Sequence, residues 1–241
     1  MEPTNQADKK NAWLIPGSII VAGILIAGAV YFANTPHGTT TATIPGTTPN
    51  SNGTVTVDSS KISTANEPFI GQQNAPLTIA YWYDYQCPYC KQNEATLMPQ
   101  LITDYVNTGK AKVVFKDFAF LGADSQTLGL ASRAVWEVAP DKFYAWHKEV
   151  FAEQGEENSG WATPAKILSI STSVLGAADA AKVQTLMTTN ATEYQKDMDA
   201  DKAEGAALGV NGTPSFIIGN QLVVGADSYS SIQSIVDSQL K

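Results

Sequence analysis

The hydrophobic and polar positions along the chain divide it into three parts. Residues 14–33 form an apolar run without a single charged side chain. Residues 34–63 are rich in Thr, Pro, Gly, Ser and Asn and almost free of large apolar side chains. In residues 64–241, apolar positions recur with the periods of strands and helices, which is typical of a folded domain. The pattern predicts an apolar segment, a polar linker and one folded domain, in that order.

The first half of the folded domain alternates between strand and helix patterns. A β-branched and aromatic run at residues 77–83 is too continuous for a half-exposed strand and predicts a central one. Residues 92–106 have apolar side chains at helical spacing, and Pro99 is expected to kink that helix. Residues 111–118 predict a second strand.

A long helical block separates these elements from the end of the domain. Helical spacing dominates about residues 121–208. Residues 215–218 and 221–224 then have strand character and flank a Gly-Asn pair, which predicts a β-hairpin. Residues 228–240 predict a closing helix. The order of the elements predicts an α/β fold with a helical insertion.

The apolar run predicts a transmembrane helix over residues 14–33. As a helix, its 20 residues rise about 30 Å, the thickness of the hydrocarbon core. Two lysines precede it, so residues 1–13 are expected in the cytoplasm and the folded domain outside it. The alternative is a signal peptide cleaved near residues 27–29. Apolar residues continue to Phe32, which favours an uncleaved anchor in the cell membrane.

Composition supports a tethered domain. The linker, residues 34–63, cannot bury enough apolar surface to offset its ordering entropy, so we expect a flexible segment with a reach of about 30 Å. Residues 64–241 contain 12 basic and 20 acidic residues, a net charge of −8. This acidic balance argues against nucleic-acid partners and against tight docking on anionic lipid.

The chain has two cysteines, and both lie in the sequence Cys87-Pro-Tyr-Cys90. A structural disulfide there would close a very short loop and gain little stability. A structural zinc ion needs four ligands, and the two histidines, His37 and His147, lie in the linker and in a predicted helix. Because Pro88 suits a first helical turn, the Cys87 thiolate is expected at a helix N-terminus, with its pKa below ~8.5. Cys90, one turn further, should be shielded.

The strand before the cysteine pair and a later Thr-Pro step resemble the DsbA-like branch of the thioredoxin superfamily. The resembling segments are residues 75–90, APLTIAYWYDYQCPYC, and residues 209–218, GVNGTPSFII. The resemblance extends over about residues 66–241. It implies a thioredoxin-like fold with a helical insertion, preceded here by the transmembrane helix and the flexible linker.

The resemblance also implies roles for six residues. Cys87 and Cys90 would be the catalytic pair, with neither a cofactor nor a metal. The residues that support this pair and line the substrate groove would be Pro88, Tyr89, Thr213 and Pro214. In this family the peptide bond before the last of these prolines is cis and faces the cysteine pair.

One position departs from the family pattern. Members commonly carry Glu or Asp six residues before the first cysteine, buried beneath the pair and able to help move protons. Here that position is Tyr81, which is neutral at pH 7. Asp84 is a candidate substitute, although it could equally be an exposed turn residue. His147 lies among core-type aromatic residues and is expected to be structural.

The resemblance implies a thiol–disulfide oxidoreductase that introduces disulfide bonds into exported, unfolded proteins with free cysteines. A substrate thiolate would attack Cys87, whose thiolate is the better stabilised leaving group. A membrane quinone-linked thiol oxidase would then reoxidise the pair. A reductase or isomerase on the same fold stays open, although no added dimerisation domain precedes this fold. A tethered peptide-binding module with inert cysteines is the alternative outside the enzymes.

Overall fold

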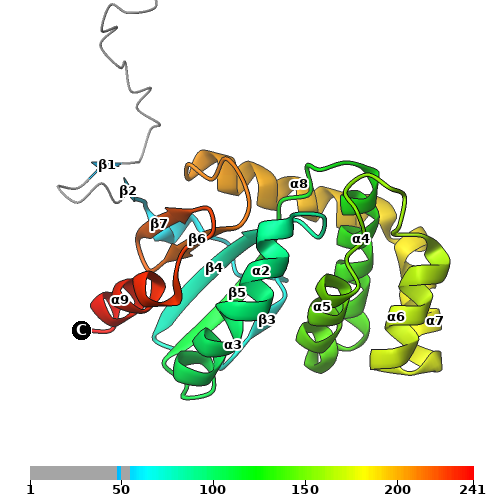
Figure 1. Cartoon of the computed structure of the whole chain (residues 1–241), viewed down its shortest axis with the longest axis horizontal. Helices are drawn as coiled ribbons and strands as arrows, with labels where there is room; N and C mark the ends of the chain where they lie inside the picture. Colours follow the sequence, from blue (N-terminus) through cyan, green and yellow to red (C-terminus); the bar gives the residue numbers. More distant parts are fainter. Residues whose placement is uncertain (1–47, 50–54) are drawn as a thin grey trace, which may run out of the picture. The chain divides into compact units, whose positions relative to one another are not determined.

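The structure of the protein is a computed structural model that describes residues 48–49 and 55–241. The predicted cytoplasmic segment (1–13), the predicted anchor (14–33) and most of the linker lie outside those residues. None of the helices in the described ranges combines the length and the apolar character needed to cross a membrane. Figure 1 shows the elements of the folded domain, coloured in the order in which they follow along the chain.

The elements follow the order that the hydrophobic pattern predicts. The strands are β1 (Thr48–Pro49), β2 (Val55–Thr56), β3 (Phe69–Ile70), β4 (Leu77–Tyr83), β5 (Ala111–Asp117), β6 (Ser215–Ile218) and β7 (Gln221–Val224). The α-helices are α2 (Pro88–Thr96), α3 (Met98–Leu101), α4 (Ala123–Val138), α5 (Phe143–Ala152), α6 (Pro164–Leu175), α7 (Ala177–Thr189), α8 (Ala191–Ala207) and α9 (Tyr229–Gln239). The shorter helical turns are η1 (Ser59–Lys61), η2 (Ile102–Val106) and η3 (Pro140–Lys142).

The strands form one sheet in the order β1-β2-β7-β6-β4-β5-β3. β4 runs parallel to β5, with Ile79 opposite Val113, and antiparallel to β6, with Ile79 opposite Ile218. The predicted central strand is therefore paired on both edges, which suits its continuous apolar sequence. β2 pairs with β7, so the chain just before the main fold adds a short strand to it.

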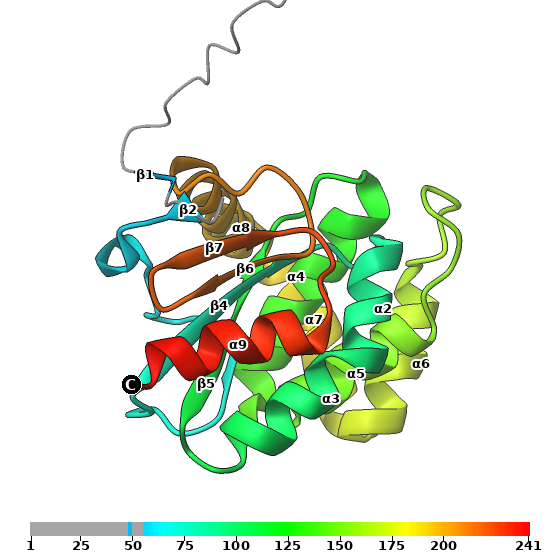
Figure 2. The same cartoon turned by 60° about the vertical axis from the view of Figure 1, so that its left-hand side comes forward.

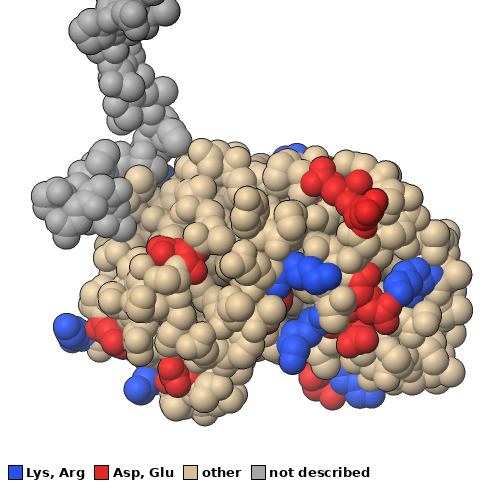
Figure 3. Space-filling model, in the orientation of Figure 1, with Lys and Arg blue, Asp and Glu red and all other residues tan. Residues whose placement is uncertain are grey.

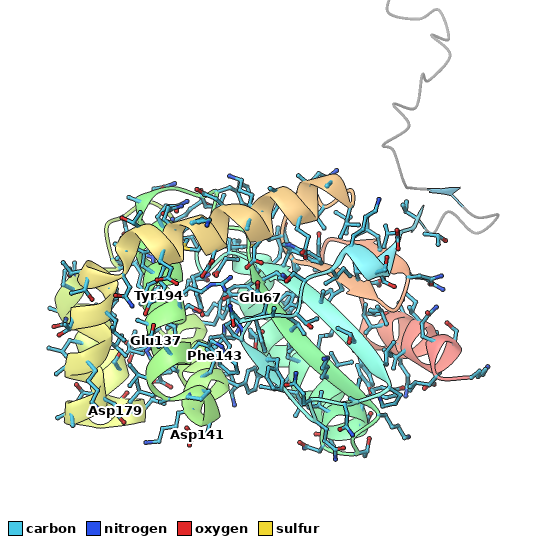
Figure 4. The ribbon with its side chains drawn as sticks, turned by 180° about the vertical axis from the view of Figure 1, so that it is seen from behind. Glu67, Glu137, Asp141, Phe143, Asp179 and Tyr194 are labelled. Atoms are coloured by element: carbon cyan, nitrogen blue, oxygen red, sulfur yellow. The ribbon has the colours of Figure 1, made fainter. Side chains whose placement is uncertain are left out.

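Side chains of β4 alternate between hydrophobic cores on the two faces of the sheet, as the two-residue period of a strand requires. Tyr81 and Tyr83 point into the larger core, to which α2, α3, α5 and α9 contribute. Figure 2 shows α9 along this face, near α3. Trp82 lies in the smaller core on the other face, where its indole N–H donates to the backbone carbonyl of Asp201 at 3.0 Å. Asp201 belongs to α8, which crosses that face in Figure 4.

The predicted helical insertion is confirmed. Helices α4 to α7 stand together beside the sheet in Figure 1, with α7 packed against α4 and α6. The last of the insertion's helices, α8, then returns across the sheet to β6. Figure 3 shows a mostly uncharged surface on one face, with small groups of acidic and basic side chains, so the acidic excess is not gathered into one patch there.

The helix that follows the cysteine pair is broken, as Pro99 predicts. α2 ends at Thr96, α3 resumes at Met98, and the π-helical turn η2 carries the chain to Val106. Pro99 has no N–H to donate to the carbonyl four residues earlier, so the hydrogen-bond ladder cannot continue through it. The break leaves α2 as a separate helix whose first turn carries both cysteines.

Several loops meet at one edge of the sheet. The parallel strands β4 and β5 end there, while the antiparallel hairpin of β6 and β7 begins and finishes there. The segments after Tyr83, after Asp117 and before Ser215 are therefore brought together, although up to 132 positions separate them in the sequence. This edge is where the cysteine pair lies.

Candidate active site

Cys87 is the residue immediately before α2, and Pro88 is the first residue of the helix. Proline suits this position because the first helical N–H groups have no partner inside the helix. Cys87 is buried, with 4% of its surface exposed, and Cys90 is buried completely. The two thiols are free, so the structure describes the reduced pair.

The two thiols have opposite pKa shifts. A hydrogen bond from Cys90 is the main cause that lowers the pKa of Cys87 to about 6; burial opposes it, and Thr213 and the backbone N–H groups of Cys90 and Tyr89 assist. Burial raises the pKa of Cys90, and the neighbouring Cys87 raises it further. The lowered pKa of Cys87 agrees with the sequence-based expectation. Its largest cause, however, is the second cysteine rather than the helix terminus.

The Thr-Pro step lies against the cysteine pair, as the resemblance implies. The Thr213–Pro214 peptide bond is cis. The Cys87 thiol lies 3.4 Å from the Thr213 carbonyl oxygen and can donate to it. The Pro214 carbonyl accepts the N–H of Gly225 at 2.8 Å, which fixes the step at the mouth of the hairpin. The fold thus brings four of the predicted site residues close together, namely Cys87, Cys90, Thr213 and Pro214.

The side chain of Tyr89, between the two cysteines, is 60% exposed. Among the residues that the structure describes, two other large apolar side chains are similarly exposed, Phe120 (45%) and Val224 (49%). Phe120 follows β5 and Val224 ends β7, so all three lie at the sheet edge that carries the cysteines. Exposed apolar side chains that gather at one place indicate an interaction surface.

Tyr81 lies beneath the pair, fully buried in the middle of β4. Its ring stacks on Phe216 at a centroid distance of 4.6 Å and an interplanar angle of 6°. Burial, and after it the charge on the Cys90 side chain, raises the pKa of Tyr81 well above its ordinary value. Its hydroxyl forms no aligned hydrogen bond with any group in the described residues. Tyr81 is therefore a neutral hydroxyl beneath the cysteine pair.

Asp84 is not an exposed turn residue; only 1% of its surface is accessible. Its carboxylate accepts hydrogen bonds from the backbone N–H of Gln86 (2.8 Å) and the hydroxyl of Ser125 (2.6 Å). It also accepts the backbone N–H groups of Phe120 (2.9 Å) and Leu121 (3.1 Å). Four donors occupy both of its oxygens, so Asp84 organises the loops at the sheet edge. The geometry does not support it as the substitute for the missing acid.

His147 has the structural role that the sequence predicts, and Glu94 is a buried partner that the sequence did not reveal. Glu94 lies on α2, one turn after Cys90, and its carboxylate accepts from the hydroxyl of Tyr144 at 3.1 Å. Its other oxygen lies 3.2 Å from Nε2 of His147, whose Nδ1 lies 2.9 Å from the hydroxyl of Tyr85. These contacts tie α2 to α5 and to the loop before Cys87.

Gln154 is a second site residue that the sequence did not reveal. Its side-chain amide donates to the backbone carbonyls of Tyr85 (2.7 Å) and Cys87 (3.1 Å), and so holds the loop that leads into α2. These partners are 67 to 69 positions apart in the sequence. A polar residue at the end of a helix carries no signal of such a contact.

Within the described ranges, the structure contains no group of three or more His, Cys, Asp or Glu residues placed to hold a metal ion.

The fold and the paired thiols define a thioredoxin-fold protein with a dithiol site, and comparisons with known proteins agree. The sequence model of the family described as thioredoxin matches residues 63–238, so the chain belongs to the thioredoxin family. Disulfide bond formation protein D of Bacillus subtilis is 26% identical over 180 residues, which cover 74% of this chain and 79% of that protein.

Two solved structures are similar to this chain. The thiol-disulfide exchange protein α-DsbA2 of Wolbachia pipientis is 26% identical with a TM-score of 0.64, covering 74% of this chain and 89% of that one. Oxidised BdbD of Bacillus subtilis has the same fold, with a TM-score of 0.67 and 24% identity over 74% of this chain and 95% of that one. Within its family, the chain is a DsbA-like thiol–disulfide oxidoreductase.

Proposed function

We propose that this protein is a thiol–disulfide oxidase that transfers the Cys87–Cys90 disulfide to exported proteins with free cysteines. The observation that carries the proposal is the asymmetry of the pair. Cys87 keeps 4% of its surface exposed and has a pKa of about 6, whereas Cys90 is completely buried and its pKa is raised. Such a pair presents one sulfur to substrate and keeps the other for the exchange within the pair.

The exchange proceeds in two balanced steps. A substrate thiolate attacks the sulfur of Cys87, a new S–S bond forms, and the bonding electrons of the Cys87–Cys90 bond stay on Cys90. A second substrate thiol, having lost its proton, attacks the substrate sulfur of the mixed disulfide, and Cys87 leaves as a thiolate. The substrate gains a disulfide, and the two electrons and the protons from its thiols reduce the pair. The low pKa of Cys87 assists the second step, because a stabilised thiolate leaves faster.

The same low pKa favours the reduced pair, which makes the disulfide an oxidant. At pH 7, a thiol of pKa about 6 is about nine-tenths thiolate. Relative to an ordinary thiol, this ionisation raises the reduction potential by at most about 30 mV. This change in reduction potential makes the pair more oxidising, but it is small compared with the range of reduction potentials found in this fold.

The surface around the pair suits an unfolded substrate. Tyr89, Phe120 and Val224 present apolar side chains at the sheet edge. The Thr213–Pro214 step provides backbone beside Cys87. An extended segment with apolar residues near its cysteine is the substrate that this arrangement favours.

We also propose that residues 14–33 anchor the protein in the cell membrane, with the oxidoreductase domain outside the cytoplasm. The uninterrupted apolar sequence and the preceding lysines support this. The anchor would place the domain beside a membrane quinone-linked thiol oxidase that reoxidises the pair. A cysteine-reactive reagent that cannot cross membranes should label Cys87 in intact cells. Labelling only after lysis would contradict the proposed location.

The reduction potential of the Cys87–Cys90 pair, measured on the full-length chain against glutathione, tests the direction of electron flow. A value between about −120 and −180 mV would support an oxidase. A value below about −230 mV would point to a reductase or isomerase on the same fold. A Cys87 that reacts as slowly as an ordinary thiol would contradict both and leave a peptide-binding module.

A further inference from the structure

Two buried hydroxyl groups beside the cysteine pair form no aligned hydrogen bond within the described residues, although each lies close enough to a cysteine side chain to take part in the pKa shifts of the site. They belong to Tyr81, on β4, and to Thr213, immediately before the cis-proline. A buried polar atom without a partner costs about 1–3 kcal/mol, and few such atoms occur in native proteins. Two of them beside the same pair of thiols indicate that they are kept for a state of the site other than the reduced one described here.

The Tyr81 hydroxyl cannot turn towards a partner elsewhere. The ring is clamped face to face by Phe216 and meets Phe115 edge-on, at a centroid distance of 6.0 Å and an angle of 63°. The same two residues pair with Tyr81 through the backbone, Phe115 from β5 and Phe216 from β6. Strand pairing and ring packing therefore fix the direction of the hydroxyl. It is held in the core that also contains Cys87 and Cys90.

The groups that act on the Tyr81 hydroxyl belong to the first turns of α2. After burial, the side chain of Cys90, the carboxylate of Glu94 and the side chain of Cys87 raise its pKa. Glu94 already accepts from Tyr144 and contacts His147. The Tyr81 hydroxyl thus keeps its proton at neutral pH and lacks an aligned acceptor while Cys90 is a thiol, although the Cys90 side chain lies within its reach.

The first step of the exchange creates that acceptor. When a thiolate attacks Cys87, the Cys87–Cys90 bond breaks and its electron pair stays on the Cys90 sulfur. Cys90 is fully buried, so this negative charge forms away from water. A buried charge without a hydrogen bond is costly. Asp84 cannot help, because four donors from other groups already occupy its carboxylate oxygens.

We propose that Tyr81 is a catalytic residue of the exchange, whose hydroxyl donates a hydrogen bond to the Cys90 thiolate as the Cys87–Cys90 bond breaks. Tyr81 keeps its proton throughout this step. No acid or base is needed to balance it, because one thiolate enters and one is formed. Donors fixed in advance at the position where charge develops lower the barrier without reorganising the site. The proposal rests on Cys87–Cys90 being the reacting pair.

The test replaces Tyr81 by phenylalanine, which keeps the ring and removes only the hydroxyl. The oxidised full-length chain is mixed with dithiothreitol at pH 7, and its reduction is followed by quenched-flow alkylation. The Tyr81→Phe variant should be reduced about tenfold to a hundredfold more slowly, the usual effect of losing a hydrogen bond to a charged group. Its unfolding midpoint in urea should be unchanged or higher, because an unpartnered buried hydroxyl has been removed. Its equilibrium reduction potential should not move, because Cys90 is a thiol in the reduced state.

Tyr105→Phe is the matched control. Its hydroxyl donates to Asp237 at 2.7 Å, away from the cysteine pair. This control should lose stability and keep the wild-type rate of reduction. Cys87→Ser, which should abolish reduction altogether, separately tests whether Cys87 belongs to the reacting pair.

Two results would overturn the proposal. One is a Tyr81→Phe rate within twofold of the wild type. The other is a slower rate accompanied by lost stability or a shifted potential, which would indicate a structural role. If Tyr81→Phe does not fold, site-specific replacement of Tyr81 by 3,5-difluorotyrosine answers the same question. Its more acidic hydroxyl is a stronger donor and should speed the reduction, and an unchanged or slower rate would contradict the proposal.

Discussion

Two buried polar regions of this protein differ in how their polar side chains are paired, one through opposite charges and the other not. One is the redox site at the end of β4. The other, called here the charged cluster, lies towards α8 and consists of Glu67, Lys116, Asp117, Arg133, Asp201 and Glu204. Figure 4 views the protein from behind, with Glu67 labelled.

In the charged cluster, each cation meets three carboxylates. Lys116 contacts Asp201 (2.9 Å), Glu67 (3.1 Å) and Glu204 (3.2 Å). The Arg133 guanidinium contacts Asp117 at 2.7 Å, Glu67 at 2.9 Å and also Asp201. These contacts join the segment before β3 to β5, α4 and α8. Such pairing offsets the desolvation of the charges, although it does not guarantee net stabilisation.

The redox site instead leaves two hydroxyls unpartnered, those of Tyr81 and Thr213. Burial alone therefore does not define the role of a polar group. Where each buried charge lies against opposite charges, its removal damages the fold. Where a buried hydroxyl lies beside a reactive sulfur without an aligned hydrogen bond, its removal should affect the reaction. The Tyr83 hydroxyl, 3.2 Å from Asp117 and 3.2 Å from Ser132, connects the two regions.

The largest expected effect is at the redox site. Replacing Cys90 with alanine should abolish disulfide transfer, and a Cys87 thiolate that attacks a substrate disulfide should stay trapped in the mixed disulfide while the second substrate sulfur leaves as a thiolate. It should also raise the pKa of Cys87 from about 6 towards that of an ordinary thiol, because the hydrogen bond from Cys90 is the main cause of the lowered value. The thiolate absorbance near 240 nm, titrated with pH, measures this shift.

Cys90→Ser is the matched variant, because serine keeps a donor where alanine has none. Its Cys87 pKa should stay closer to the wild-type value than that of Cys90→Ala. Equal pKa values in the two variants would mean that the helix terminus, rather than Cys90, stabilises the thiolate.

The next largest effect is on stability, in the charged cluster. Replacing Arg133 with methionine leaves the four carboxylates of the cluster with Lys116 as its remaining cation. Breaking a buried ion pair in this way typically costs about 3–5 kcal/mol. Urea unfolding should show a loss in that range, while the fraction that remains folded is reduced by dithiothreitol at the wild-type rate.

The double variant Arg133→Met with Asp117→Asn is the control for the cluster. It removes one cation and one of its anions, so it should recover part of the lost stability. A single variant as stable as the wild type would show that the cluster is not a matched network.

The two regions should also respond to pH with opposite signs. The pKa of Asp201 rises from 3.8 to about 7, mainly through burial. Between pH 4 and 7 the folded chain then holds a proton that the unfolded chain has released, so this group lowers the free energy of unfolding as pH rises. The pKa of Cys87 falls from 9.0 to about 6. Between pH 6 and 9 the unfolded chain holds the extra proton, so stability rises with pH.

Oxidation separates these two effects, because the disulfide form has no thiol to titrate. The stability of the reduced chain relative to the oxidised chain should increase from pH 6 to pH 9. Asp201→Asn should flatten the dependence between pH 4 and 7 in both forms. A reduced-minus-oxidised difference that stays flat above pH 6 would mean that Cys87 has an ordinary pKa.

Local patterns predicted most of the fold because they depend on near neighbours in the sequence. The continuous run of β4 required a central strand, Pro99 required a break, and the Gly-Asn pair required a hairpin. The cysteine pair with Thr213-Pro214 likewise located the site, because the fold family fixes their meeting. For these features the residue types themselves carry the constraint.

The contacts that support the site could not be predicted in the same way. Glu94 and His147 are 53 positions apart and meet only because α2 packs against α5. The sequence left Asp84 open between a substitute for the acid and an exposed turn residue, since three of the four donors to its carboxylate lie 36 to 41 positions away. Likewise, a sequence does not show whether the hydroxyl of a core tyrosine such as Tyr81 has a partner.

The smallest expected effect tests whether the number of ion pairs or their burial determines how much the charged cluster contributes to stability. Lys182 contacts Asp179 at 2.9 Å on the same helix, but its side chain is 65% exposed. Exposed pairs at this spacing stabilise a helix by about 0.2–0.5 kcal/mol, because water and salt screen them. Lys182→Ala should therefore shift the urea midpoint barely measurably, whereas Lys116→Met should destabilise the fold by several-fold more. Comparable losses from both lysines would show that the number of ion pairs, rather than their burial, determines stability.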